Sequence, residues 1–158
     1  MSLRQTDRGD KMRQVQIKDI VKAVGGKLVW GDENATVTNV STDSREVKTG
    51  TLFVPIIGER VDAHRFIPDV MTKGALATLS ERELPEADYA YIQVDASLQA
   101  VKDIAEFYLE QLQIPVVGIT GSVGKTSTKE MIASVLAQKY HVHKTLGNFN
   151  NEWGLPIT

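Results

Sequence analysis

The chain has 158 residues, no cysteine and a formal net charge of −2 at pH 7. The length suits about one domain with a proper core, and the absence of cysteine excludes disulfides and thiolate metal sites. The small net charge argues against a surface for nucleic acid or lipid headgroups, and no apolar run approaches the ~20 residues of a membrane-spanning helix.

The first thirteen residues, MSLRQTDRGDKMR, are polar and lack the apolar region of a secretory signal. We interpret residues 1–13 as an unstructured leader. We expect a cytoplasmic protein with no membrane insertion and no nucleic-acid partner.

Helical and strand spacings alternate from residue 14 to residue 112. Apolar residues at i, i+3, i+4 and i+7 predict a short helix over 17–24 that two glycines end. Pro55 suggests an edge or a bulge in its strand, and Pro68 should lie in the first turns of its helix. The other predicted elements are strands over 27–30, 35–40, 51–57, 75–79 and 90–94 and helices over 63–73 and 98–112.

Two features of this region could bind a ligand. The loop Ser41-Thr42-Asp43-Ser44-Arg45 ends in a guanidinium that can grip a phosphate or carboxylate in a forked geometry. The alternative, which composition alone favours, is a capped turn with a surface arginine. His64 lies at the start of a predicted helix, where a solvated or capping histidine is favoured over a ligand.

The segment from Val116 to Ser127, VVGITGSVGKTS, joins an apolar β-branched strand to a glycine-rich turn, Lys-Thr and a helix. In this arrangement, typical of a phosphate-binding loop, backbone N–H groups and the helix N-terminus surround a polyphosphate. The general pattern has glycine where this chain has Ile119. The alternative is a plain strand–turn–helix with a chance Gly-Lys-Thr.

The phosphate-loop pattern assigns roles to its residues. Lys125 is placed for the β- and γ-phosphates of ATP, and the Thr126 hydroxyl is placed for Mg²⁺. These two residues are the predicted catalytic groups. The residues predicted to bind the nucleotide are Gly121, Ser122, Val123, Gly124, Lys125, Thr126 and Ser127.

A helix, a strand over 142–145 and an asparagine-rich segment at 147–156 follow the loop. His141 and His143 would share one face of the strand, but without a nearby carboxylate or cysteine we expect no structural metal. The asparagines suit a loop that recognises polar ligand groups, or an ordinary turn. The predicted buried face of the helix is formed by Met131, Ile132, Val135 and Leu136.

These elements predict an α/β protein with two parts. Residues 14–112 would form a small, complete N-terminal α/β substrate domain. Residues 113–158 would form the start of a P-loop parallel-sheet ATPase domain, because such a sheet needs several βαβ units. We therefore expect that this chain alone does not hydrolyse ATP at an enzyme-like rate.

Four segments in this order resemble the Mur ligases, the ATP-dependent amide-forming enzymes of bacterial cell-wall precursor synthesis. They are STDSR at 41–45, LFVPIIGERVDAHRFI at 52–67, GITGSVGKTSTKEM at 118–131 and GNFNNEWGLP at 147–156. The resemblance implies three domains, which bind the UDP part of the substrate, ATP and the incoming amino component. This chain would hold the first domain and the start of the second.

The resemblance also implies substrates and site residues. The asparagine-rich segment favours the member that adds D-Ala-D-Ala to a UDP-N-acetylmuramoyl-tripeptide over the member that adds lysine or diaminopimelate. The implied cofactors are ATP and Mg²⁺, and the protein would be a monomer. The implied substrate-binding residues are Thr42, Ser44, Arg45, Arg60, His64, Asn148, Asn150 and Asn151.

In the implied reaction, ATP converts the peptide carboxylate to an acyl phosphate, and the amine of D-Ala-D-Ala then attacks it. Other readings remain open at this point. The chain could belong to a Mur ligase that adds a different amino acid, or it could be a non-catalytic module that binds a UDP-sugar. A phosphotransferase built on the same loop would have to explain the preceding domain.

Overall fold

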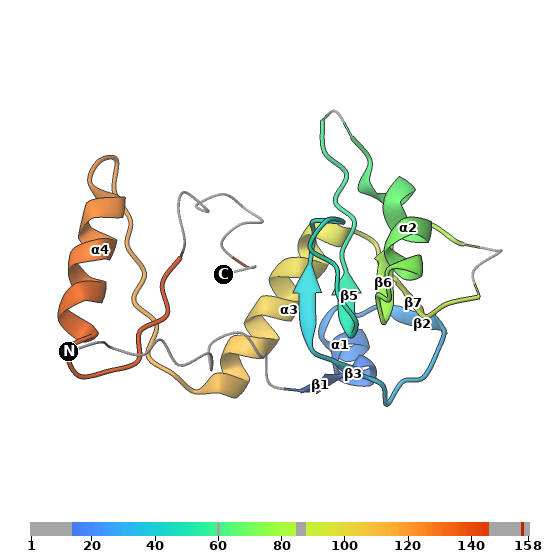
Figure 1. The fold of residues 1–158 in the computed structure, drawn as a ribbon, viewed down its shortest axis with the longest axis horizontal. Coiled ribbons are helices and arrows are strands. Elements are labelled where there is room, and N and C mark those ends of the chain that lie inside the picture. Colours follow the sequence, from blue (N-terminus) through green and yellow to red (C-terminus); the bar gives the residue numbers. More distant parts are fainter. Residues whose placement is uncertain (1–13, 60, 85–87, 146–155, 157–158) are drawn as a thin grey trace. The chain divides into compact units, whose positions relative to one another are not determined.

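The computed structural model describes residues 14–59, 61–84, 88–145 and 156 of the chain. The chain divides between Ile104 and Ala105 into two compact units, so the long helix α3 contributes to both. Figure 1 shows the elements in chain order. They are β1 (Val15–Gln16), α1 (Ile17–Ala23), β2 (Lys27–Trp30), β3 (Thr36–Val37), β4 (Asn39–Ser41), β5 (Thr51–Phe53), η1 (Ala63–Phe66), α2 (Ile67–Thr72), β6 (Ala77–Ser80), β7 (Tyr91–Gln93), α3 (Ser97–Leu112) and α4 (Lys125–Leu136).

A five-stranded sheet with the order β2-β7-β6-β5-β4 forms the centre of the first unit. The strands β4, β5, β6 and β7 are parallel, and β2 pairs with β7 antiparallel. A separate antiparallel ladder joins β1 to β3. Because four strands are parallel, the loops that follow them leave from one edge of the sheet, which we call the carboxyl edge.

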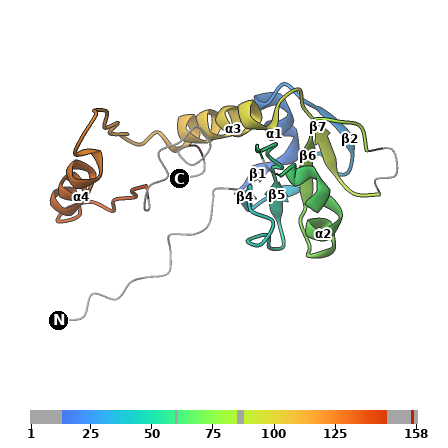
Figure 2. The ribbon, with the colours of Figure 1, turned by 90° about the horizontal axis from the view of Figure 1, so that it is seen from above.

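Helices cover both faces of this sheet (Figure 2). In the first unit, α1 and the part of α3 up to Ile104 lie on one side, and α2 lies on the other. Every residue of β5 is buried, as expected for a parallel strand covered on both faces. The core on the α2 side consists of Phe53, Ile67, Val70 and Ala75.

The helices predicted from apolar spacing are confirmed as α1, α3 and α4. The helix predicted over 63–73 is a 3₁₀ turn, η1, followed directly by α2. Pro68 lies in the first turn of α2, where the missing N–H costs little. None of the helices in the described ranges combines the length and the apolar character that crossing a bilayer requires.

Two strand segments of the first unit differ from the prediction by more than two residues or in their pairing. The segment 35–40 divides into β3 and β4, which belong to different sheets. The segment 51–57 leaves the sheet after Phe53. Pro55 follows the end of β5, which is an interior strand, so the predicted edge or bulge position is wrong. The ladder ends before the proline, which has no N–H to donate.

The second unit contains no strand among its described residues, so the strands predicted at 116–119 and 142–145 are wrong. A strand needs a neighbour to pair its backbone groups, and the described part of this unit supplies none. For the same reason Met131 and Val135 of α4 are each 70% exposed, and the buried face predicted there is wrong. The buried residue of α4 is Ala133.

The core on the α2 side gives a stability prediction. Ile67 is 1% exposed, and its truncation in Ile67→Ala should lower the free energy of unfolding by about 2–5 kcal/mol through lost burial and a cavity. The matched control is Ile57→Ala, because Ile57 is 52% exposed and the change there should stay within about 0.5 kcal/mol. Urea unfolding followed by circular dichroism measures both. Equal losses in the two variants would contradict the packing described here.

Candidate functional site

The phosphate-loop segment turns at two glycines with positive φ. Gly121 has a φ of 148° and Gly124 a φ of 81°, and residues with a side chain rarely adopt these values. Gly124 immediately precedes α4 and has the left-handed conformation. The glycine turn and the helix expected from the sequence are therefore both present.

Lys125 is the first residue of α4, and its side chain folds back over the turn. Its Nζ donates a hydrogen bond to the Gly121 carbonyl oxygen at 2.5 Å. A Cβ atom added at Gly118 or Gly124 would meet no atom within 4 Å, so the space beside these glycines is open. Open space, an ammonium group and the first N–H groups of a helix together fit a bound phosphate chain.

The remaining residues of the predicted nucleotide loop are accessible. Ser122 and Val123 form the tip of the turn, and the Val123 side chain is 89% exposed. Thr126 and Ser127 are exposed in the first turn of α4, where a hydroxyl can reach a cation held by phosphates.

Two lysines connect the segment after α4 to this helix. Lys129 Nζ donates to the Thr145 carbonyl oxygen at 2.5 Å, and Lys144 pairs with Glu130. The hydrogen bond from Lys144 lowers the pKa of Glu130. These contacts hold residues 144–145 beside α4. The predicted site residues Arg60, Asn148, Asn150 and Asn151 lie outside the described residues.

His141 and His143 do not lie on a strand. Within the described ranges, no group of three or more metal-ligating side chains could hold an ion.

In the first unit, two buried serines form the turns that leave the carboxyl edge. After β4, Ser41 Oγ accepts a hydrogen bond from Asp43 N and donates one to Asp43 O, both at 3.1 Å. After β6, Ser80 Oγ accepts from Arg82 N at 3.2 Å and donates to Arg82 O at 2.6 Å. The same hydroxyl-stabilised turn therefore occurs at two strand ends.

The predicted substrate loop presents an arginine held by its neighbouring carboxylate. Arg45 Nε donates to Asp43 Oδ1 at 2.9 Å, and Arg45 Nη2 donates to Oδ2 at 2.5 Å. The hydrogen bonds from Arg45 lower the pKa of Asp43 to about 2. The Arg45 side chain is 86% exposed, whereas Thr42 and Ser44 are half-buried beside it. The guanidinium is thus oriented but accessible to an anion.

His64 is buried, and both of its ring nitrogens are engaged, so the predicted solvated position is wrong. Asp62 Oδ1 accepts hydrogen bonds from His64 N at 2.9 Å and from Nδ1 at 2.7 Å. His64 Nε2 accepts one from Glu81 N at 3.1 Å. This pattern assigns the ring proton to Nδ1. His64 therefore joins the loop before η1 to the turn after β6.

Three residues that the sequence did not predict as site residues form contacts around His64, directly or through Asp62. Asp62 caps η1 and pairs through Oδ2 with Arg82, and the hydrogen bond from the His64 backbone lowers the pKa of Asp62 to about 2. Glu81 Oε1 accepts from Ser97 N at the start of α3, at 2.7 Å. The Asp-x-His spacing at 62–64 could have indicated the cap, but nothing local indicated Glu81 or Arg82.

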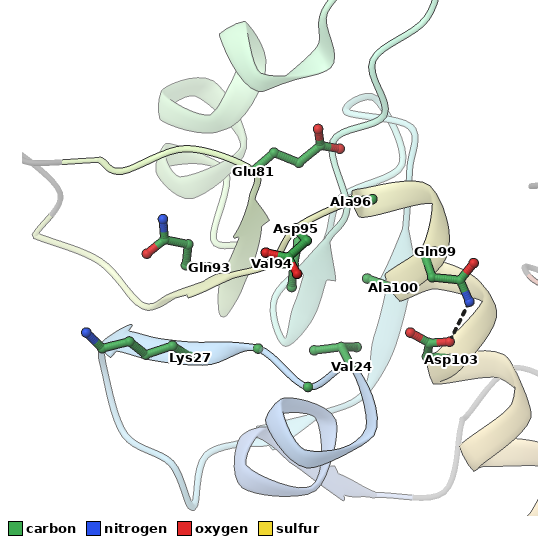
Figure 3. A pocket seen from close by; sticks show the side chains of 12 residues that line it. Val24, Lys27, Glu81, Gln93, Val94, Asp95, Ala96, Gln99, Ala100 and Asp103 are labelled. Atoms are coloured by element: carbon green, nitrogen blue, oxygen red, sulfur yellow. Dashed lines mark hydrogen bonds between the residues drawn. The ribbon is translucent and has the colours of Figure 1, made fainter.

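A groove of about 550 Å³ opens beside Glu81, between the turn after α1, the end of β7 and the start of α3 (Figure 3). Its charged lining includes groups of both signs, such as Lys27 and Asp95, and Gln99 donates to Asp103 at 2.7 Å. It contains none of the site residues predicted from the sequence.

Comparison with known proteins identifies the two units separately. The Mur ligase family, catalytic domain, matches residues 36–109, and the Mur ligase middle domain matches residues 119–158. The first match includes the carboxyl edge, and the second includes the phosphate loop. The chain belongs to the Mur ligase family.

Curated Mur ligases resemble this chain over most of its length. The UDP-N-acetylmuramoyl-tripeptide–D-alanyl-D-alanine ligase of Bacillus subtilis is 43% identical over 145 residues, which are 90% of this chain and 32% of the relative. The enzyme of the same name from Escherichia coli is 37% identical over 147 residues, or 93% of this chain and 32% of the relative. The chain therefore spans about a third of the length of these relatives.

Solved Mur ligase structures also match. The UDP-N-acetylmuramoylalanyl-D-glutamyl-2,6-diaminopimelate–D-alanyl-D-alanyl ligase of Acinetobacter baumannii aligns with a TM-score of 0.85 at 31% identity, over 92% of this chain and 33% of that protein. The MurF ligase of Thermotoga maritima, solved in complex with ADP, aligns with a TM-score of 0.69 at 39% identity, over 75% and 28%. These matches confirm the predicted α/β fold with a parallel sheet.

The Asp62 carboxylate should make the stability of this Mur ligase chain depend on acid pH. Its pKa of about 2 in the fold lies below the ordinary value of 3.8, so its contribution is present above about pH 4 and is lost as the pH falls toward 2. Asp62→Asn should therefore lower the urea midpoint at pH 7 and give a shallower decline between pH 4 and pH 2. Identical declines in the variant and the unsubstituted chain would contradict this role.

Proposed function

We propose that this chain forms the UDP-substrate module and the start of the ATP-binding module of a Mur ligase. The ligase would add D-Ala-D-Ala to a UDP-N-acetylmuramoyl-tripeptide in peptidoglycan precursor synthesis. The observation that carries the proposal is the turn from Gly121 to Gly124, closed by Lys125 at the start of α4. The names of the Bacillus subtilis and Escherichia coli relatives support this member of the family.

In this proposal the phosphate loop binds Mg-ATP, which supplies the phosphoryl group that activates the peptide carboxylate. The backbone N–H groups from Gly121 to Gly124 surround the phosphates. Lys125 exchanges its contact with the Gly121 carbonyl for the phosphate oxygens and neutralises their charge. The Thr126 hydroxyl would hold Mg²⁺. Ser122, Val123 and Ser127 complete the loop. The ADP present in the Thermotoga maritima MurF structure supports nucleotide binding.

The carboxyl edge of the first unit binds the UDP part of the substrate in this proposal. Thr42, Ser44 and Arg45 offer two hydroxyls and an oriented guanidinium for the uridine and phosphate groups. Because both nitrogens of His64 are engaged within the fold, His64 acts as a positioning residue for this loop. Further contacts to the substrate are proposed for Arg60, Asn148, Asn150 and Asn151.

The proposal also keeps the predicted domain organisation, in which the substrate module is formed by residues 14–112 and the start of the ATP module by residues 113–158. It further includes a cytoplasmic location and a monomeric state, which rest on the resemblance to the family.

The test is a ligation assay on the full-length product of the gene that encodes this chain, with UDP-N-acetylmuramoyl-tripeptide, Mg-ATP and D-Ala-D-Ala. Lys125→Ala should lower kcat/KM by about 10³-fold or more, because Lys125 neutralises the transferring phosphoryl group. Its affinity for the UDP substrate, measured by calorimetry, should not change. Lys139→Ala is the control, because Lys139 lies beyond the end of α4 and should keep full activity.

Three results would contradict the proposal. Ligation by Lys125→Ala at the unsubstituted rate would remove the role of the phosphate loop. Ligation of single amino acids in preference to D-Ala-D-Ala would assign the chain to another Mur ligase. UDP binding without any ligation would indicate a non-catalytic binding module.

A further inference from the structure

The carboxyl edge repeats one structural device on the two sides of β5. Ser41 at the end of β4 and Ser80 at the end of β6 make the same pair of hydrogen bonds to the residue two positions on. Each serine carbonyl then accepts a hydrogen bond from the neighbouring strand end, from Val54 N at 2.8 Å and from Val94 N at 3.0 Å. The two turns are therefore fixed to the sheet in the same way.

Each of these turns is associated with an arginine that a carboxylate orients. Arg45 is held by Asp43 within its own turn. Arg82 is held by Asp62, which comes from the loop before η1 and is itself fixed by two hydrogen bonds from His64. The second arginine thus depends on a buried histidine, whereas the first depends only on local sequence.

The Arg82 guanidinium keeps most of its capacity to bind an anion. Its side chain is 55% exposed, and Nη2 is the atom that pairs with Asp62. Among residues 14–59, 61–84 and 88–145, no hydrogen bond uses its Nε or Nη1. A planar guanidinium anchored on one side can present its remaining N–H groups to a phosphate in a forked geometry.

The stabilising effect of such a pair does not account for this arrangement. Exposed ion pairs contribute about 0–1 kcal/mol to folding. The strands β4 and β6 lie on either side of β5, so their ends are separated by about 10 Å. Arg45 and Arg82 therefore lie on turns at the same sheet edge. The spacing of these turns allows two long side chains to contact one bound group from opposite sides.

We propose that Arg82 is a second anion-binding residue of the substrate site, which grips the diphosphate of the UDP substrate from the side opposite Arg45. This role rests on the proposed function of the carboxyl edge. Asp62 and His64 act as positioning residues, because they set the orientation of the guanidinium without contacting the ligand.

The experiment compares UDP with uridine, which lacks the diphosphate, on the 158-residue chain. Two-dimensional NMR titration of ¹⁵N-labelled protein measures both dissociation constants even when binding is weak. Arg82→Gln should weaken UDP binding about tenfold, as expected for the loss of a charged hydrogen bond, and should leave uridine binding unchanged. Arg82→Lys should lie between the two, because it keeps the charge and loses the fork.

The matched control is Arg65→Gln, which removes the same charge from η1. The Arg65 guanidinium lies 4.6 Å from the centre of the Phe66 ring and is not part of the two turns. UDP affinity should change less than twofold in this variant. A thermal melt of each variant separates loss of binding from loss of folding.

The outcomes separate the role of Arg82 from the proposed substrate site itself. If the unsubstituted chain binds UDP and Arg82→Gln binds it equally well, Arg82 has no role while the substrate site stands. An equal loss for UDP and uridine also overturns this role, because it indicates a structural effect. If the unsubstituted chain binds neither compound, the proposed substrate site itself fails. If Arg65→Gln loses as much UDP affinity as Arg82→Gln does, the loss comes from the change in net charge. That result would overturn a specific contact between Arg82 and the diphosphate.

Discussion

The parallel alignment of β4, β5, β6 and β7 is the constraint on which the first unit of this structure depends. Parallel strands direct every following loop to the same edge, so turns that are distant in sequence meet there. Ser41 and Ser80 end two of these strands with the same hydroxyl turn. An antiparallel arrangement would have divided the same polar residues between two opposite edges.

The buried imidazole of His64 then converts a set of neighbouring loops into an ordered site. It donates to Asp62 and accepts from the backbone of Glu81, and Glu81 in turn accepts from the first turn of α3. Buried polar groups that are fully hydrogen-bonded stabilise one arrangement over its alternatives. Asp62 remains available on its outer side to orient Arg82.

The phosphate loop obeys a different, local constraint. Gly124 needs a left-handed conformation just before α4, and Gly121 also has a positive φ. These angles need no distant contact, and the Lys125 side chain spans only the turn itself. The loop therefore keeps its turn and its helix although no strand is formed ahead of it in the described residues.

The sequence by itself determined the local features of this protein. Apolar spacing located α1, α3 and α4, and the glycine-rich Gly-Lys-Thr segment located the turn before α4, because both depend on neighbours within a few residues. It also placed Arg45 in an exposed loop. Tertiary structure alone decided the strand order, the end of β5 before Pro55, the burial of His64, its contact with Glu81 and the pairing of Asp62 with Arg82. The strands predicted at 116–119 and 142–145 were wrong, because a strand forms only beside a second strand that pairs with its backbone groups. Apolar composition does not show whether such a second strand is present.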